Sequence, residues 1–149
     1  MNIFVDADAS PVQEEVIQIA SKFNLEVTLV KSFSHYSHTN QASNVKTVYV
    51  DKGADMADFE IIKRARKGDL IVTQDYGLAS LGLGKGCLVI HHKGFQYTDK
   101  NIDRLLTTRH ASALARRGGL RTKGPKPFTE EDRKKFILLL QKLLTESSL

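Results

Sequence analysis

The sequence predicts a single α/β domain over residues 1–149, built on an open, mainly parallel sheet. Short apolar, strand-favouring runs alternate with amphipathic helical patterns along most of the chain. Such alternation is typical of parallel strands joined by crossover helices. A chain of 149 residues can bury a sizeable core, and its 41% hydrophobic and 26% charged content is ordinary for a globular protein.

The chain opens with a strand that runs directly into two acids. Residues 3–5 are apolar, and Asp6 and Asp8 follow them. Ligands of open parallel sheets bind beyond the carboxyl ends of the strands, so these two carboxylates are candidates to share one cation. The alternative is that Asp8 and Ser10 merely start the next helix and that Asp6 is a turn residue. Pro11 fits the first position of that helix.

A helix and further strands follow in the expected order. Val12 and Val16 share one helical face, and Asn24 closes this first helix. The remaining strands are expected at residues 25–30, 45–50, 70–72 and 87–90. His35 and His38 lie in a polar stretch without a helical pattern, and we expect a loop there rather than metal ligands.

A second acidic cluster lies at the start of the next helix. At about 100° per residue, Asp55 and Asp58 fall on the same side as Phe59 and Ile62, which we expect to be buried. Two charges on that side are costly unless a cation or a cleft receives them. Helix capping and dipole complementarity explain one of the two acids, but not both.

Glycines indicate where two helices end. The second helix is expected to run to about Lys67, with Gly68 as its left-handed cap. The glycine-rich residues 81–86 match no phosphate-binding loop, and we interpret them as a helix end before the strand at 87–90. The lone cysteine, Cys87, is expected to be a buried thiol in that strand. A single cysteine excludes an intramolecular disulfide and fits a reducing compartment.

A third group of polar residues follows the strand at 70–72. If this strand is parallel to the first, Asp75 reaches the same edge as Asp6, and the acids together can hold Mg²⁺ or Mn²⁺. Such a site supports in-line displacement at phosphorus. The candidate catalytic residues are Asp6, Asp8, Asp55, Asp58 and Asp75, and the candidate metal ligands are Asp6, Asp55, Asp58 and Asp75. Ser10 and Thr73 are candidates to orient water or phosphate.

Charge is divided unevenly along the chain. Residues 1–75 carry 8 Lys or Arg and 11 Asp or Glu, whereas residues 76–149 carry 14 and 6. The densest basic segment is a predicted loop at 116–128, which can follow a phosphate backbone without reading bases. Its candidate nucleic-acid contacts are Arg116, Arg117, Arg121, Lys123 and Lys126. A solvated linker is the alternative, and Phe128 is the one aromatic residue beside the segment.

The remaining segments are expected to be structural. His91 and His92 follow the strand at 87–90, and because neighbours on a strand face opposite ways we do not expect both to face one site. A helix begins near Asn101. The last helix, about 129–146, starts at Thr129 with acids in its first turn and an apolar stripe that packs on the sheet or on a partner subunit, as in a homodimer.

Four motifs occur in a fixed order over nearly the whole chain. They are Val5-Asp6-Ala7-Asp8-Ala9, Gly53-Ala54-Asp55-Met56-Ala57-Asp58, Val72-Thr73-Gln74-Asp75-Tyr76-Gly77-Leu78-Ala79 and Gly124-Pro125-Lys126. In these motifs the chain resembles the YaiI/YqxD family, also called UPF0178 or DUF188. That family is placed among PIN-like domains, whose better-known members are metal-dependent ribonucleases.

The resemblance implies a three-layer α/β/α sandwich around a central, mainly parallel sheet of 4–5 strands, with acids that bind one or two divalent ions. Carried over by position, Asp6 matches the acid after the first strand and Asp75 the acid after the fourth. Asp55 or Asp58 matches the helix acid. The family usually has Cys where this chain has Ser10, so any chemistry of that thiol is lost here.

The sequence therefore predicts a metal-dependent nuclease that acts on nucleic acid, with RNA favoured. One alternative is a PIN-like module that binds RNA without cutting it. Another is a phosphatase of the haloacid-dehalogenase type, in which Asp6 would be the nucleophile. That type expects Thr or Val after its second Asp, where this chain has Ala9. No apolar stretch approaches the roughly 18 residues of a membrane span, and the acidic N-terminus is unlike a signal peptide, so we expect a cytoplasmic protein without a membrane partner.

Overall fold

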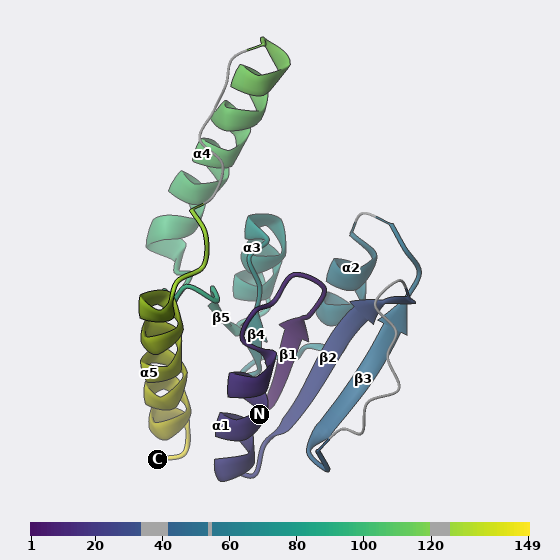
Figure 1. The fold of residues 1–149 in the computed structure, drawn as a ribbon, viewed down its shortest axis with the longest axis vertical. Helices are drawn as coiled ribbons and strands as arrows, with labels where there is room; N and C mark the ends of the chain where they lie inside the picture. The colour runs from purple at the N-terminus through teal and green to yellow at the C-terminus, as the bar shows by residue number, and fades with distance from the viewer. Residues whose placement is uncertain (34–41, 54, 120–125) are drawn as a thin grey trace.

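The computed structural model describes residues 1–33, 42–53, 55–119 and 126–149. Within them, a sheet of five parallel strands carries helices on both faces (Figure 1). The strands are β1 (Asn2–Asp6), β2 (Glu26–Ser32), β3 (Val45–Val50), β4 (Leu70–Val72) and β5 (Leu88–Ile90). The helices are α1 (Gln13–Lys22), α2 (Met56–Arg64), α3 (Tyr76–Gly84), α4 (Asp99–Arg117) and α5 (Glu130–Ser147). The predicted loop residues His35 and His38 lie outside the described residues, as do Arg121 and Lys123.

The strand order creates a point where the chain reverses direction across the sheet. The order is β3-β2-β1-β4-β5, and every neighbouring pair is parallel. The chain moves from β1 outward to β3, and then returns to the other side of β1 to form β4. Val5 of β1 pairs with Val72 of β4, so Asp6 and Thr73 leave the sheet side by side. Ligands of open α/β sheets bind at such a switch point.

Alternating residues of the strands feed two separate cores, which makes the sandwich three layers deep. Ile3 and Val5 of β1 face α1 and α5. Phe4 faces the opposite way, toward α2, α3 and α4. Asp6 continues on the side of Phe4, because side chains alternate along a strand. The α/β/α sandwich with a parallel sheet is therefore confirmed, and Asp6 points to the layer that carries the other site acids.

The last helix forms as predicted. Thr129 accepts a hydrogen bond from the backbone N–H of Asp132, and the Asp132 side chain accepts one from Thr129 in return. This capping box satisfies two donors at the helix start. Its buried stripe is made of Phe136, Leu140, Leu143 and Leu144. Burying each of these side chains contributes about 1.5–3 kcal/mol, which holds α5 against α1 and the sheet.

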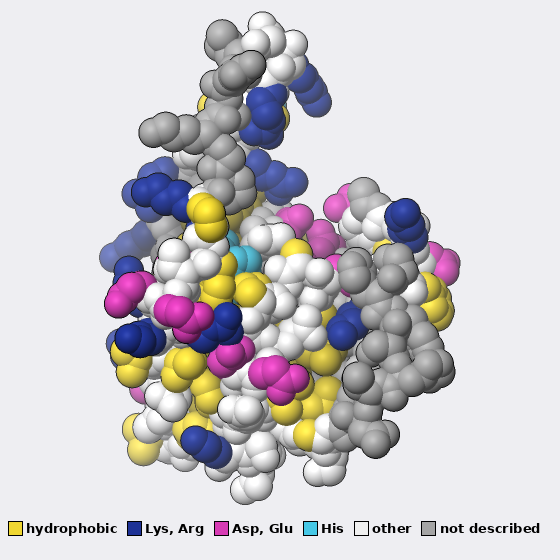
Figure 2. Space-filling model, in the orientation of Figure 1, with side chains coloured by type: hydrophobic (Ala, Val, Ile, Leu, Met, Phe, Trp, Pro, Cys, Tyr) yellow, Lys and Arg dark blue, Asp and Glu magenta, His cyan; other side chains and the backbone are white. Residues whose placement is uncertain are grey.

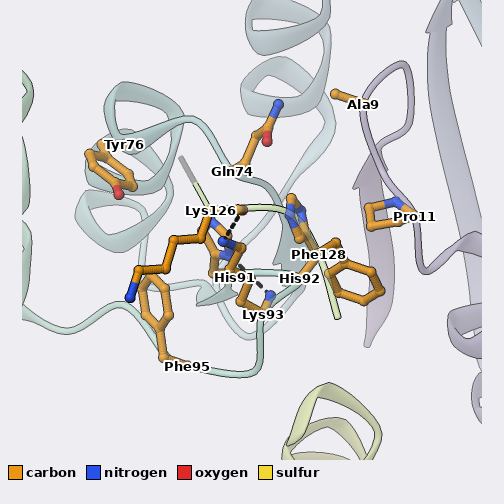
Figure 3. A pocket seen from close by; sticks show the side chains of 10 residues that line it. All are labelled: Ala9, Pro11, Gln74, Tyr76, His91, His92, Lys93, Phe95, Lys126 and Phe128. Carbon is orange, nitrogen blue, oxygen red and sulfur yellow. Dashed lines mark hydrogen bonds between the residues drawn. The ribbon is translucent and has the colours of Figure 1, made fainter. Parts of the chain in front are cut away.

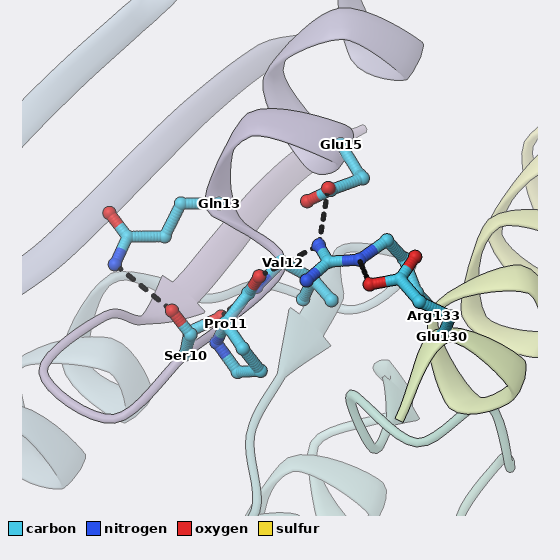
Figure 4. A network of polar contacts seen from close by, with 7 residues as sticks. All are labelled: Ser10, Pro11, Val12, Gln13, Glu15, Glu130 and Arg133. Carbon is cyan, nitrogen blue, oxygen red and sulfur yellow. Dashed lines mark hydrogen bonds and ion pairs between the residues drawn. The ribbon is translucent and has the colours of Figure 1, made fainter. Parts of the chain in front are cut away.

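The start of α1 differs from the prediction. Val12, without a side-chain cap, occupies the position before the helix, so Ser10 is not its cap and Pro11 is not its first residue. Gln13 instead donates from its side-chain amide to the Ser10 carbonyl at 3.3 Å (Figure 4). Arg133 of α5 donates to the Pro11 carbonyl at 3.1 Å. The connection between β1 and α1 is therefore longer than predicted, and hydrogen bonds from Gln13 and from Arg133 of α5 hold it in place.

The course of α2 also differs. The helix ends at Arg64, because Ala65 turns to an extended conformation with ψ 141°, so the helix stops before Lys67. Gly68 does adopt a positive φ of 90°, but in the turn that leads to β4. Phe59 is 67% exposed and Ile61 is fully buried. The prediction that Phe59 is buried was therefore wrong, whereas Ile62 packs partly buried against the core as predicted.

The helix α4 is longer than predicted and stands out from the body (Figure 1). It contains Arg116 and Arg117 in its last turn, so the predicted loop at 116–128 starts two residues later, at Gly118. Along this helix, which is described over its whole length, Ile102 is the one buried residue, and it lies in the first turn. The outer half of α4 thus has no buried side chain. No helix within the described residues is long and apolar enough to span a membrane.

Candidate functional site

The centre of the candidate site is a polar link between the ends of β1 and β4. The Thr73 hydroxyl donates to Oδ2 of Asp6 at 3.1 Å, and it accepts from the backbone N–H of Asp75 at 2.9 Å. Asp75 in turn caps α3 by accepting from the N–H of Leu78 at 2.9 Å. The local sequence explains this arrangement, since a short buried strand ends in a hydroxyl residue and then in a helix-capping acid. The structure therefore brings Asp6, Thr73 and Asp75 together, as predicted.

Asp58, from the first turn of α2, completes the acidic group. Burial raises its pKa to about 6, and the negative charges of Asp75 and Asp6 add to this increase. Burial likewise raises the pKa of Asp6, against the hydrogen bond from Thr73, and Asp75 and Asp8 add to the increase. Asp6 and Asp58 thus lie close enough to each other and to Asp75 for the neighbouring negative charges to disfavour their own ionised forms.

An open cleft of about 380 Å³ lies against these acids. Asp6 and Asp75 line it, together with Gln74, Tyr76, His91 and Arg109. Nη1 of Arg109, on α4, lies 3.7 Å from Oδ1 of Asp75. Gly77 keeps this contact open, because a Cβ at that position would stand 3.1 Å from the same carboxylate oxygen. The cleft therefore offers two acids and one guanidinium to a ligand.

The other predicted site residues lie further out. Asp8 is exposed, and both its oxygens accept from the backbone N–H of Ser32 at 3.1 Å, which ties the β1–α1 connection to the end of β2. Asp55 is exposed and precedes α2 in a left-handed conformation, with φ 69°. The Ser10 hydroxyl accepts from the N–H of Val12 at 3.4 Å. Of these three residues, Asp55 and Asp8 contribute charge to the acidic group, and Ser10 shapes the turn.

The prediction that His91 and His92 do not face one site was wrong. Both side chains are 7% exposed, their ring centroids lie 4.4 Å apart, and both line one pocket beside the acidic cleft (Figure 3). The chain has already left β5 at Ile90, so strand alternation no longer applies to them. Burial lowers the pKa of His91 to about 4, with His92 and Lys93 adding to the effect. Both histidines directly follow a strand that ends at the same edge of the sheet as the site acids, and this position in the sequence could have predicted that they lie near the site.

Basic residues lie along α4, the helix that contributes Arg109 to the acidic cleft. Figure 2 shows Lys and Arg side chains gathered over α4, above acidic side chains near the middle of the same face. The basic residues of α4 are Lys100, Arg104, Arg109, Arg116 and Arg117. Lys126 is exposed and lines the same pocket as the two histidines. Positive charge beside an acidic centre is an arrangement that receives a polyanion.

Within the described part of the chain, no three His, Cys, Asp or Glu side chains stand as a group that could hold a metal ion by themselves. The donor chemistry fits a hard cation nonetheless. Mg²⁺ keeps several waters and binds through one or two carboxylates plus substrate phosphates. Asp6 and Asp75 offer two such carboxylates at an open cleft, which leaves room for waters and a phosphate. Repulsion among the acids is the cost that such a cation would relieve.

Comparisons with known proteins agree with the motif resemblance. A UPF0178 protein from Bacillus cereus is 59% identical over 144 residues, covering 97% of this chain and 99% of its own. A UPF0178 protein from Bacillus thuringiensis subsp. konkukian is also 59% identical with the same coverage, and one from Bacillus mycoides is 58% identical. Among solved structures, Rae1 (YacP) from Bacillus subtilis is similar with a TM-score of 0.44 and 17% identity, over 99% of each chain. No functional inference rests on that structural similarity.

The family assignment rests on the sequence relatives and on one family model. The model described as "Uncharacterized BCR, YaiI/YqxD family" matches residues 4–146. This span contains Asp6, Asp58 and Asp75, the three acids of the candidate site. The chain belongs to the YaiI/YqxD family, also called DUF188 or UPF0178.

Proposed function

We propose that this protein is a metal-dependent nuclease that hydrolyses phosphodiester bonds in nucleic acid, with RNA as the favoured substrate. The observation that carries the proposal is the meeting of Asp6, Asp58 and Asp75 at the switch point of the sheet, where burial and mutual repulsion raise the pKa of Asp6 and of Asp58. A fold does not assemble three such carboxylates for stability, because each makes the others less favourable.

Asp6 and Asp75 are the residues that would hold Mg²⁺ or Mn²⁺, and Asp58 and Asp55 would add negative charge beside them. One or two such ions would supply Lewis-acid polarisation of the scissile phosphate and an activated water. Thr73 fixes the carboxylate of Asp6 through its 3.1 Å hydrogen bond, so that this oxygen is held before any ligand arrives. Preorganisation of this kind is what a phosphoryl-transfer site requires.

Arg109 has a separate task in the proposed reaction. Its guanidinium is half exposed and stands at the mouth of the cleft, 3.7 Å from Asp75. At that distance its attraction to Asp75 is weak, and it remains able to bind a phosphate oxygen with its other donors. We assign Arg109 to holding the negatively charged substrate against the acids, and to offsetting charge that develops on the phosphate.

The basic side chains of α4 and Lys126 support a polymeric substrate. Arg116 and Arg117 lie in the last turn of α4, outside the cleft, where a mononucleotide bound at the acids would not reach them. Contacts of Lys and Arg with a phosphate backbone supply affinity without base recognition. Arg121 and Lys123 belong to the same proposal on the strength of the sequence.

The test is a cleavage assay on labelled single-stranded and duplex RNA and DNA, with Mn²⁺, with Mg²⁺ and with EDTA. The wild-type protein is compared with Asp6→Asn, which can still accept from Thr73, and with Asp51→Asn, which changes an exposed acid outside the cleft. We expect metal-dependent cleavage that Asp51→Asn retains and that Asp6→Asn loses by at least about a hundredfold. Binding without cleavage under every metal condition would contradict the nuclease and leave a nucleic-acid-binding module.

A further inference from the structure

A second pocket, of about 530 Å³, lies directly beside the acidic cleft and shares three residues with it. Gln74, Tyr76 and His91 line both spaces, so the two form one continuous depression. Four separate stretches of chain build the second pocket, namely the connections after β1, β4 and β5 and the segment before α5 (Figure 3). Its volume lies within the range of about 300–1,000 Å³ that is typical of a site for one small molecule.

Rings dominate the walls of this pocket. His91 stacks on Phe95 with centroids 4.6 Å apart and an interplanar angle of 18°. His92 meets the edge of Phe128 at 5.6 Å and 73°. Tyr76 stands on the side nearest the acids. We name this the aromatic pocket, lined by Tyr76, His91, His92, Phe95 and Phe128. Rings arranged in this way offer flat faces to a planar ligand.

The polar groups of the aromatic pocket suit an anion attached to that planar ligand. Lys93 and Lys126 line it, and no Asp or Glu does so among the described residues. The ring nitrogens of His92 make no hydrogen bond with any other described residue, so they are available to a bound molecule. Nδ1 of His91 accepts from the backbone N–H of Lys93 at 3.0 Å, which leaves Nε2 as the donor of that ring.

Packing and hydrogen bonds hold the turn that carries His91 and Phe95 in place. Gly94 closes the turn by donating to the His91 carbonyl at 2.9 Å, and its φ is +91°. A Cβ on Gly94 would stand 2.5 Å from Cβ of Lys135, so the turn rests directly on α5. Nζ of Lys93 donates to the Lys126 carbonyl at 2.6 Å and so joins this turn to the segment that carries Phe128. The rings are therefore held in place before a ligand binds.

From this geometry we infer that the aromatic pocket binds one unpaired nucleotide next to the phosphate to be cut. The base stacks among the rings, and the adjoining phosphate lies between Lys93 or Lys126 and the acidic cleft. A base engaged on its faces in this way is not paired within a helix, so the substrate is a single strand. The inference rests on the proposed function, because it names the substrate class of the same site.

The test measures binding and leaves cleavage out. Fluorescence anisotropy in EDTA, with the Asp6→Asn protein, follows a labelled RNA single strand of mixed sequence. The same RNA in duplex form and an abasic strand of equal length and charge serve as comparisons. The key variant is Phe128→Leu, and its matched control is Phe23→Leu, because both rings are partly buried against the same core but Phe23 lies at the opposite edge of the sheet. Thermal melts check that each variant is folded.

We expect the single strand to bind at least about tenfold more tightly than either the duplex or the abasic strand. Phe128→Leu should weaken single-strand binding about tenfold, in keeping with the loss of one stacked base, whereas Phe23→Leu should leave it unchanged. Should Phe128→Leu unfold, Lys126→Gln changes an exposed side chain and should weaken binding with a smaller salt dependence.

Equal binding of the abasic and the normal strand, or of Phe128→Leu and Phe23→Leu, would overturn the inference. The two proposals fail separately. A protein that binds the single strand through Phe128 but cuts nothing with Mn²⁺ loses the nuclease and keeps the nucleotide pocket. A protein that cuts RNA with the same KM and binding after Phe128→Leu keeps the nuclease and loses the pocket.

Discussion

Asp58 is a site residue whose charge the folded protein disfavours. Its pKa rises to about 6, mainly through burial and then through Asp75 and Asp6. Between pH 3.8 and about 6 the folded state therefore binds more protons than the unfolded state, so the free energy of unfolding falls as the pH rises through this window. Above this window the carboxylate is a full cost to stability. A bound cation would relieve a cost of this kind.

The variant Asp58→Asn should therefore be more stable than the wild type at about pH 7.5 in EDTA. Asp58 is partly exposed, and solvent screening limits the gain to about 1 kcal/mol, or roughly 2–4 °C in Tm. At about pH 4, where the wild-type carboxyl is largely protonated, the difference should vanish. Calorimetric melts at the two pH values check this, with Asp51→Asn as the exposed control. A destabilised Asp58→Asn at the higher pH would contradict the repulsion that we describe.

Asp8 has a different role from Asp6 although the two acids stand in one motif. Its two oxygens accept from the N–H of Ser32, a residue that is 8% exposed. We predict that Asp8→Ala lowers the free energy of unfolding by about 1–3 kcal/mol, because a buried donor loses its charged acceptor. Asp8→Asn keeps one acceptor oxygen and should lose less than half as much. Urea melts measure both values, and equal losses for the two variants would show that the hydrogen bond is unimportant.

The turn between β5 and α4 carries His91 and His92, whose shared position in one pocket the sequence pattern did not predict. Through His91 this turn also makes the stability of the protein sensitive to acid. Burial lowers the pKa of His91 from 6.5 to about 4, so between these values the unfolded state binds a proton that the folded state does not. The free energy of unfolding contributed by His91 is therefore fully present above pH 6.5, and it is lost as the pH falls toward 4. The raised pKa of Asp58 acts in the opposite direction over part of this range.

A comparison of variants separates the two effects. His91→Asn removes the titrating ring but keeps an acceptor for the N–H of Lys93. We expect the Tm of this variant to fall less than that of the wild type between about pH 7 and about pH 4.5, although it starts lower because the stack on Phe95 is lost. His110→Asn, on the exposed outer half of α4, is the control. Parallel pH profiles for wild type and His91→Asn would contradict a neutral, buried His91.

The outer half of α4 is an element with charge but little burial. Changing both Arg116 and Arg117 to Ser should weaken single-stranded RNA binding and lower the slope of log K against log salt by about 1.4, because two phosphate contacts are lost. Stability should stay within about 0.5 kcal/mol, since neither side chain is buried. Changing the exposed Lys22 and Lys142, on α1 and α5, is the matched control. An unchanged salt slope would exclude α4 from the binding surface.

At the scale of the whole molecule, residue patterns predicted the parallel sheet and the delivery of acids to one of its edges, and the family resemblance implied the three layers. The runs around Ile3 and Ile71 are buried strands, and their ends deliver Asp6 and Asp75 to one edge because both strands are parallel. The order of strands makes that edge a switch point, which fixes the place of any ligand. The strands and their shared edge follow from local residue types and general rules of connection, whereas the strand order comes from the structure.

The features that could not be predicted depend on packing between distant segments. Phe59 is exposed because α2 turns Ile61 toward the sheet. The sequence pattern of a helix of only nine residues does not determine which of its apolar residues faces the core. Phe95 and Phe128 belong to one pocket because α5 holds the turn beneath them. The basic segment of the sequence has few aromatic residues of its own, and the fold brings rings from other parts of the chain to the pocket beside it.

The most direct test of a divalent-ion site at the β1/β4 edge is a calorimetric titration of the wild-type protein with Mn²⁺ near neutral pH. Asp75→Asn is the decisive variant, because Asn keeps the cap of α3 and removes the charge. We predict saturable binding by the wild type and by Asp51→Asn, and binding at least about tenfold weaker in Asp6→Asn and in Asp75→Asn. Identical isotherms for the wild type and the two site variants would show that the acids at this edge hold no cation.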